Sequence, residues 1–530
     1  MNFKFFSFIS LASFSGTLIH ASSAERTKER KHPNILFCIA DDAGHMSAYG
    51  TPWLSTPAFD RIAQEGLLFE NVYTCNAKSA PSRATFITGR NSWQLKEACN
   101  HWPNFPAEFK SYPEALLENG YHTGCTGKGW GPGLAKDAQG KNRELTGKMW
   151  NAKKLVPPTK GICNIDYAAN FREFMKNRPK DKPFCFWYGS LEPHRNYEYA
   201  SSLRLGKNVS QVNIVPPYWP DNDIVRTDML DYAVEIEHFD HHLGLILQAL
   251  EEAGELENTI IIATSDHGMP FPRCKGQDYN NSNHIPFAVM WKKGIRNPGR
   301  KVKEYISSID VAPTLLEVAG LNEKKTGMQP VTGRSFMDIL RNRKTNTDRD
   351  FIMLGKERHD VGRPDDQGYP IRALIRGDYL YIRNYEINRW PAGNPETGYM
   401  NVDGGATKTE ILKARRNPAT AHFWQLSFGK REAEELYNIR KDPDCMINLA
   451  GKKEYEERMR AMEKEMTARL VEQEAPRIFG RGYIFDRYPD TSSAQQAWNR
   501  MKAGEKVPDS WIEKTDYEPG ASGLNINWKK

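Results

Sequence analysis

The stretch "NILFCIADD" at residues 34–42 decides the fold, because it joins an uninterrupted apolar run to two carboxylates. A strand that faces solvent on one side alternates apolar and polar residues, whereas a strand buried on both faces is apolar throughout. The run 34–40 therefore predicts a central strand of a mostly parallel sheet. Asp41 and Asp42 then follow its carboxyl end, where open α/β sheets bind their ligands.

Apolar strands and capped helices continue to alternate after this strand. Further strands are expected at 67–74, 183–190, 258–264 and 286–291, and helices at 56–66, 111–120, 232–254 and 307–320. Thr56 is predicted to cap the first of these helices, with Pro57 in its first turn. This alternation predicts a doubly wound α/β sheet with helices on both faces.

The pattern changes in the last third of the chain. Residues 370–385 predict two alternating strands joined by a turn, and 453–473 predict an amphipathic helix. Because 530 residues exceed the usual size of a single core, we expect two domains. The larger spans 25–345, and a smaller α+β domain with an antiparallel sheet and a tail spans 346–530.

The first residues have the features of a secretory signal peptide, predicted to span 1–24. Lys4 precedes an apolar run at 5–19, and small residues stand at Ser22 and Ala24. The run is shorter than the roughly 20 residues that a membrane anchor needs, which favours cleavage. We therefore expect a periplasmic or secreted protein with no membrane span in its mature form.

Charge and cysteine content exclude several classes of function. The net charge of +7 is spread along the chain, whereas nucleic-acid binding requires a concentrated basic stripe. An anionic small substrate fits this balance. The eight cysteines contain no C-x-x-C pair, which argues against a zinc knuckle or a thioredoxin-like site.

Acidic and histidine side chains follow three of the predicted strands. These are Asp41 and Asp42, Glu192 and His194, and Asp266 and His267. If the strands are neighbours, the carboxylates converge, and burying like charges without a partner is costly. A divalent cation resolves the conflict, and oxygen-rich ligation favours calcium or magnesium. The alternative is that each motif only caps the turn that follows its strand.

The stretch "SAPSR" at 79–83 begins with a serine that has no base beside it. Ser79 follows the strand at 67–74, and Pro81 suits the first turn of a helix that ends near Gly89. A helix N-terminus attracts anions, and Arg83 lies one turn inside the helix. This pattern predicts a site for an oxyanion.

"SAPSR" followed by "ATFITGR" (84–90) resembles the signature of the type I sulfatases of the alkaline-phosphatase-like superfamily. The resemblance implies that a maturase converts Ser79 to formylglycine (3-oxoalanine) before folding. One hydroxyl of its hydrate attacks sulfur to form a sulfated hemiacetal, and the other expels sulfate. The stretches 355–384 and 432–450 resemble serine-type, sulfamidase-like (heparan N-sulfatase-like) bacterial members.

The resemblance also implies a metal site. Asp41 and Asp42 match the family's metal-binding pair. Asp266 matches the third acidic ligand, and His267 the fourth. Ser79, as formylglycine, completes the shell, and the metal of the family is normally calcium.

Further residues match the family's catalytic positions. Arg83 resembles the arginine that holds the hydrate, and Lys128 the lysine that bridges hydrate and sulfate. His194 resembles an acid for the leaving oxygen or a sulfate donor, and Lys275 the second sulfate-binding lysine. Where the family usually has Lys-x-His, this chain has Trp130 instead of the histidine. In the family that histidine contacts the formylglycine hydroxyl; the candidates to replace it are His45 and His101, and the alternative role for Trp130 is a wall against a sugar ring.

The resemblance implies that the second domain contributes side chains to the substrate pocket. The predicted sugar contacts are Arg358, His359 and Asp360. The implied activity is a sulfatase that hydrolyses sulfate esters of a sulfated carbohydrate. The alternatives are a sulfamidase that cleaves the N-sulfate of glucosamine, a phosphatase or phosphonate hydrolase of the same superfamily, and a sulfate-binding relative without activity.

Overall fold

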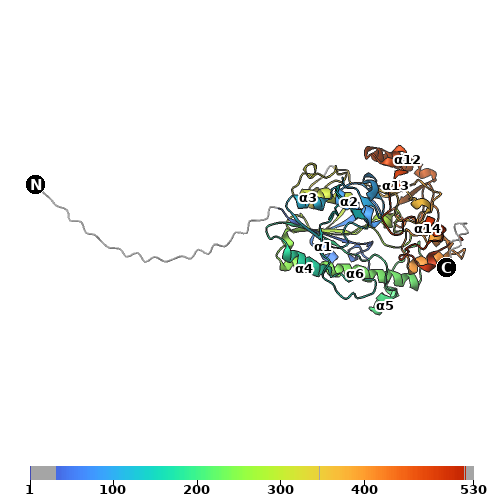
Figure 1. Ribbon diagram of the computed structural model, residues 1–530, viewed down its shortest axis with the longest axis horizontal. Helices are drawn as coiled ribbons and strands as arrows, with labels where there is room; N and C mark the ends of the chain where they lie inside the picture. Colours follow the sequence, from blue (N-terminus) through green and yellow to red (C-terminus); the bar gives the residue numbers. More distant parts are fainter. Residues whose placement is uncertain (2–31, 345–346, 519, 521–530) are drawn as a thin grey trace. The chain divides into compact units, whose positions relative to one another are not determined.

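The computed structural model describes residue 1 and residues 32–344, 347–518 and 520 (Figure 1). The predicted signal peptide at 1–24 therefore lies outside the described residues, apart from Met1. From His32 onward the chain forms one compact unit. The division into domains at residue 345 stays a prediction.

Strand β1 (Asn34–Ala40) lies inside the larger sheet, whose strand order is β10-β2-β9-β8-β1-β7-β4-β6. It pairs in parallel with both β7 and β8. The other strands of this sheet are β2 (Leu67–Tyr73), β4 (His122–Gly127), β6 (Lys148–Met149), β7 (Phe184–Gly189), β8 (Thr259–Ser265), β9 (Phe287–Met290) and β10 (Arg300–Ser307). Because β9 runs antiparallel to β2 and β8, the sheet is mixed.

Helices cover both faces of this sheet, as the sequence predicts. Leu36 and Cys38 of β1 pack with α1, α4 and α6, whereas Ile35 and Phe37 pack with α2, α3 and α8. Figure 1 shows α2 and α3 on one side and α4 and α6 on the other. The bounds are α1 (Pro57–Glu65), α2 (Ser79–Thr88), α3 (Tyr112–Glu118), α4 (Tyr167–Asn177), α6 (Asp223–Glu252) and α8 (Val311–Val318).

The N-terminus of α1 is capped by another residue than predicted. The Thr56 side chain makes no capping hydrogen bond, because its hydroxyl lies 2.7 Å from the hydroxyl of Ser47. Instead Asp240, from α6, accepts hydrogen bonds from the backbone N–H groups of Ala58 and Phe59 at 2.9 and 2.7 Å. A carboxylate at a helix N-terminus also matches the helix dipole.

The smaller sheet has the antiparallel order β11-β12-β13-β14. Its strands are β11 (Phe351–Lys356), β12 (Ile371–Arg376), β13 (Tyr379–Asn384) and β14 (Glu434–Asn438). Helix α12 (Glu456–Glu472) buries its apolar side chains against one face. The other face packs on Tyr73 and Tyr279, which come from the first part of the chain. The predicted hairpin and helix are thus confirmed.

Short elements complete the described chain. They are β3 (Asn104–Phe105), β5 (Leu134–Ala135), α5 (Ser201–Arg204), α7 (Asn280–Asn283), α9 (Met337–Leu340), α10 (Ala406–Ala414), α11 (Ala421–Phe428), α13 (Ile484–Arg487) and α14 (Ala497–Lys502). Within the parts of the chain that the structure describes, none of the helices has the length and apolar character needed to cross a membrane.

Helix α6 begins at Asp223, earlier than the predicted residue 232, and its extra turns carry a buried ion pair. Asp228 accepts hydrogen bonds from both terminal nitrogens of Arg195 at 2.9 and 2.7 Å. It also accepts hydrogen bonds from the backbone N–H and the hydroxyl of Thr407 at 2.9 and 2.7 Å. This carboxylate therefore connects the loop after β7 to the C-terminal third of the chain.

We expect Asp228→Ala to lower the free energy of unfolding by about 3–5 kcal/mol, because it leaves a buried guanidinium without its partner. Urea denaturation checks this value. The matched control is Asp221→Ala: Asp221 pairs with Arg226 at the same end of α6 but has an exposed side chain, so its loss costs at most about 1 kcal/mol. Equal effects of the two substitutions would contradict the role given to Asp228.

Candidate active site

The carboxyl ends of β1 and β8 lie side by side and bring the predicted acidic residues together. The parallel register pairs Ala40 with Ser265, so the residues that follow each strand are neighbours. The backbone N–H of Asp42 donates to Oδ1 of Asp266 at 2.9 Å. Asp42 has a φ of 74°, so the chain turns sharply at this residue.

Asp42, Asp266 and His267 form a buried cluster that fits a cation. One donor atom from each lies within 4.8 Å of the others. Nδ1 of His267 lies 2.9 Å from the carbonyl oxygen of Gly268, so this nitrogen carries the proton and Nε2 offers a lone pair. Nε2 lies 2.8 Å from Oδ1 of Asp42, and among the described residues neither atom has a hydrogen-bond partner besides the other. A cation between them would satisfy both atoms.

Asp41 is not part of this cluster, because both of its carboxylate oxygens contact cationic side chains. Nζ of Lys128 lies 2.8 and 2.6 Å from the two carboxylate oxygens, and a terminal nitrogen of Arg83 lies 3.2 Å from Oδ1. Burial alone would raise the pKa of Asp41, but Lys128 and Arg83 hold it well below its usual value. Asp41 is therefore a carboxylate at neutral pH.

Ser79 is the first residue of α2, and its hydroxyl lies between two charged groups. Oγ donates to Oδ1 of Asp41 at 3.0 Å and accepts from Nζ of Lys128 at 3.1 Å. Arg83, one turn further, donates from Nε to Oδ2 of Asp266 at 2.9 Å. The helix ends at Thr88, and Gly89 follows in a left-handed conformation with φ of 69°, as the sequence predicts.

Lys275 joins the cation cluster to the C-terminal part of the chain. Its ammonium lies 2.6 Å from Oδ2 of Asp42 and 2.5 Å from Oδ2 of Asp403. Burial tends to raise the pKa of Asp403, but the charge of Lys275 outweighs this effect, and the pKa falls to about 2. The sequence carries no signal for Asp403, because this residue lies in a loop without strand or helix periodicity.

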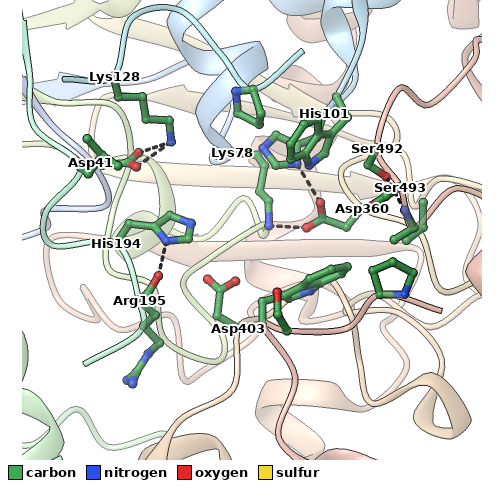
Figure 2. Close-up of a pocket in the computed structure, with 18 of the residues that line it drawn as sticks. Asp41, Lys78, His101, Lys128, His194, Arg195, Asp360, Asp403, Ser492 and Ser493 are labelled. Atoms are coloured by element: carbon green, nitrogen blue, oxygen red, sulfur yellow. Dashed lines mark hydrogen bonds and ion pairs between the residues drawn. The ribbon is translucent and has the colours of Figure 1, made fainter. Parts of the chain in front are cut away.

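A cavity of about 490 Å³ opens beside these groups (Figure 2). Asp41, Lys128 and His194 line it from the first part of the chain, and Asp360 and Asp403 line it from the second. His194 has Nδ1 at 2.6 Å from the carbonyl oxygen of Arg195. The cavity lining also includes Lys78, for which the sequence predicts no role, and His101, one of the two candidates to replace the missing family histidine.

Of the three predicted sugar contacts, only Asp360 lines this cavity. The guanidinium of Arg358 donates to the carbonyl oxygens of Tyr488 and Pro489 at 2.6 and 3.2 Å. Nε2 of His359 lies 2.6 Å from Oδ1 of Asn76. The loop after β11 therefore directs the three side chains to different surroundings, and they do not share one surface.

Trp130 is buried in the core and is absent from the cavity lining. Its ring packs edge-on against Phe105, with centroids 5.0 Å apart. The structure therefore gives no support to the prediction that Trp130 forms a wall against a sugar. Among the described residues, the histidines that line the cavity are His101 and His194.

A sheet covered by helices on both faces, with a serine at a helix N-terminus beside an acidic cluster at the strand ends, is an alkaline-phosphatase-like fold. The chain belongs to the sulfatase family: the family model described as Sulfatase matches residues 33–321, which is more than half of the sequence. As a sulfatase, this protein is a sulfuric ester hydrolase.

Characterised relatives and solved structures agree with this assignment. An ulvan-active sulfatase of Formosa agariphila is 26% identical, covering 84% of this chain and 76% of the relative. An N-acetylglucosamine-6-O-sulfatase of Bacteroides thetaiotaomicron is 27% identical, covering 83% and 87%. Human N-sulphoglucosamine sulphohydrolase is 24% identical, covering 77% and 86%. A structure solved with its substrate D-glucosamine-2-N,6-O-disulfate shares the fold, with a TM-score of 0.58, 20% identity, and coverage of 84% and 98%.

Proposed function

We propose that this enzyme hydrolyses sulfate esters of a sulfated polysaccharide or oligosaccharide, using a formylglycine formed from Ser79 and a bound calcium ion. The main structural support for this proposal is the position of the Ser79 hydroxyl, which lies 3.0 Å from Asp41 and 3.1 Å from Lys128. The relatives named for ulvan, N-acetylglucosamine-6-sulfate and N-sulphoglucosamine support a carbohydrate substrate.

Asp42, Asp266 and His267 would hold the calcium ion, with Asp41 and the modified Ser79 completing its shell. When bound, the ion supplies positive charge that polarises the oxygens of sulfate and of the nucleophile. The donor set is mainly carboxylate oxygen, which calcium prefers. Oδ1 of Asp42 and Nε2 of His267 support this assignment, because they face each other and have no further partner among the described residues.

The cationic side chains position the nucleophile. The Ser79 hydroxyl stands for one oxygen of the formylglycine hydrate, which supplies one hydroxyl to attack sulfur and another to expel sulfate. Lys128 contacts both this oxygen and Asp41, so its charge stabilises the oxyanion that forms there. Arg83 donates to Asp266 and to the carbonyl oxygen of Gly129 at 2.9 Å each, which fixes α2 against both loops.

His194 and Lys275 complete the proposed machinery. His194 lines the cavity and its Nδ1–H is held by a backbone carbonyl, so the imidazolium form of the ring would give its Nε2 proton to the leaving oxygen and become neutral. Lys275 lies next to Asp42, where its ammonium would bind a sulfate oxygen beside the cation.

Secretion and maturation are part of the same proposal. The apolar N-terminal run supports export to the periplasm or the medium. A maturase that oxidises serine must act before folding, because the Ser79 side chain is buried in the folded chain. A host without such a maturase would produce inactive protein.

A panel of sulfated saccharides tests the proposed function. We expect protein that was matured by a serine-acting maturase to release inorganic sulfate from at least one of them. Release of a free amine together with sulfate from an N-sulfated glucosamine would favour the sulfamidase alternative. Release of phosphate from phosphate esters without any release of sulfate would overturn the proposal in favour of a phosphatase.

The C-terminal segment closes one side of the cavity and is proposed to bind the saccharide. Trp511 lines the cavity, and its indole N–H donates to the carbonyl oxygen of Met400 at 2.9 Å. We expect Trp511→Ala to raise KM for a sulfated oligosaccharide roughly 3- to 10-fold, because aromatic contacts are worth about 0.5–1.5 kcal/mol. The matched control is Trp498→Ala, since Trp498 lies in the same segment and bonds Glu396. A larger effect at Trp498 would contradict the assignment.

A further inference from the structure

A network of charged side chains forms the wall of the cavity on the far side from Lys128 (Figure 2). Asp360 forms an ion pair with Lys78 and lies 2.7 Å from Nδ1 of His101. Lys78 directly precedes Ser79, and its ammonium also donates to the carbonyl oxygen of Asn401 at 3.3 Å. All three side chains line the cavity although each residue is at least nine-tenths buried.

Asp360 fixes the protonation of the His101 ring. Burial raises the pKa of Asp360, but Lys78 and His101 lower it well below its usual value, so it is a carboxylate and can only accept. Nδ1 of His101 must therefore carry the proton, which leaves Nε2 as an acceptor. Burial lowers the pKa of His101 to about 4 despite Asp360, so the imidazole is neutral at pH 7.

Nε2 of His101 can accept a hydrogen bond from a substrate in the cavity. Among the described residues it has no hydrogen-bond partner, and it is not sealed from the cavity. The ring is also held in place: the backbone N–H of His101 donates to the carbonyl oxygen of Arg358 at 3.1 Å, and that of Arg358 donates to Oδ1 of Asn100 at 3.1 Å. The acceptor is thus pre-organised.

We propose that Nε2 of His101 accepts a hydrogen bond from a free hydroxyl of the sugar that carries the sulfate. This inference rests on the proposed function and names a specificity determinant of the same cavity. A sugar hydroxyl can donate to the neutral imidazole, whereas a sulfate group only accepts and would leave two acceptors facing each other. The enzyme therefore selects saccharides that are not sulfated at this hydroxyl.

The experiment compares two substrates of mature, calcium-loaded enzyme: the best sulfated saccharide and 4-nitrophenyl sulfate, which has no free hydroxyl. We expect His101→Ala to lower kcat/KM for the saccharide roughly 10- to 100-fold and for the aryl sulfate by less than about 3-fold. His101→Gln is the second variant if the alanine variant folds poorly. The matched control is His241→Ala, because His241 is exposed on α6.

Equal losses of kcat/KM on both substrates would show that His101 acts on the chemical step. Unchanged kinetics of His101→Ala would show that His101 does not contact the saccharide. Either result overturns the inference. A wild-type enzyme that cleaves neither substrate would instead defeat the proposed function. In that case, calorimetric titration with the desulfated saccharide tests His101: the inference predicts at least a roughly 10-fold weaker affinity in His101→Ala, and unchanged affinity overturns it.

Discussion

Replacing Ser79 with alanine is expected to abolish sulfate release, by roughly 10⁴-fold or more in kcat. The alanine side chain has no hydroxyl-bearing carbon that a maturase can oxidise to the aldehyde, and it removes the oxygen that contacts both Asp41 and Lys128. Sulfate release from the best saccharide of the panel is the measurement. Binding of the desulfated saccharide should persist, because Ser79 contributes only to the reacting end of the cavity.

Two control substitutions test whether the effect is specific to Ser79. Ser55→Ala removes an exposed hydroxyl at the start of α1 and should leave turnover unchanged. Ser79→Cys should regain activity only in a host whose maturase oxidises cysteine, since the same aldehyde then forms from a thiol. Sulfate release that survives Ser79→Ala would rule out a nucleophile derived from this residue.

Removing the metal is expected to have the second large effect. Treatment with a calcium chelator should lower kcat at least about 100-fold, because the sulfate then loses its main electrostatic partner. The melting temperature should fall as well, since Asp42 and Asp266 approach each other without a cation between them. Added calcium should restore both values.

Asp42→Asn tests the same site within the chain. This substitution removes the carboxylate whose Oδ1 faces Nε2 of His267 at 2.8 Å in the proposed calcium site, so the variant should purify with less calcium by elemental analysis. Asp181→Asn is the matched control, because Asp181 is exposed in the turn before β7. Full activity of the wild type after exhaustive chelation would contradict the calcium assignment.

The sequence predicts those parts of the site that are attached to regular elements. Asp42 and Asp266 follow buried apolar strands, and the carboxyl ends of parallel strands lie at the same edge of the sheet. Ser79 and Arg83 lie on a helix whose start is marked by Pro81 and whose end is marked by Gly89. Hydrophobic periodicity and turn residues are local signals, and they are sufficient here.

Contacts between distant segments are not encoded in such local signals. Asp403 reaches Lys275 from a loop, and Asp360 reaches Lys78 from another. The position of His101 depends on backbone hydrogen bonds to the segment at 358. The burial of Trp130 against Phe105 likewise depends on packing that no single stretch of sequence describes.

The chemical state of residue 79 is the most direct test of the central claim. Tandem mass spectrometry of the peptide that spans residue 79, taken from protein that releases sulfate, measures it. The account predicts formylglycine, a residue about 2 Da lighter than serine. An active preparation in which residue 79 is entirely unmodified serine would contradict the account.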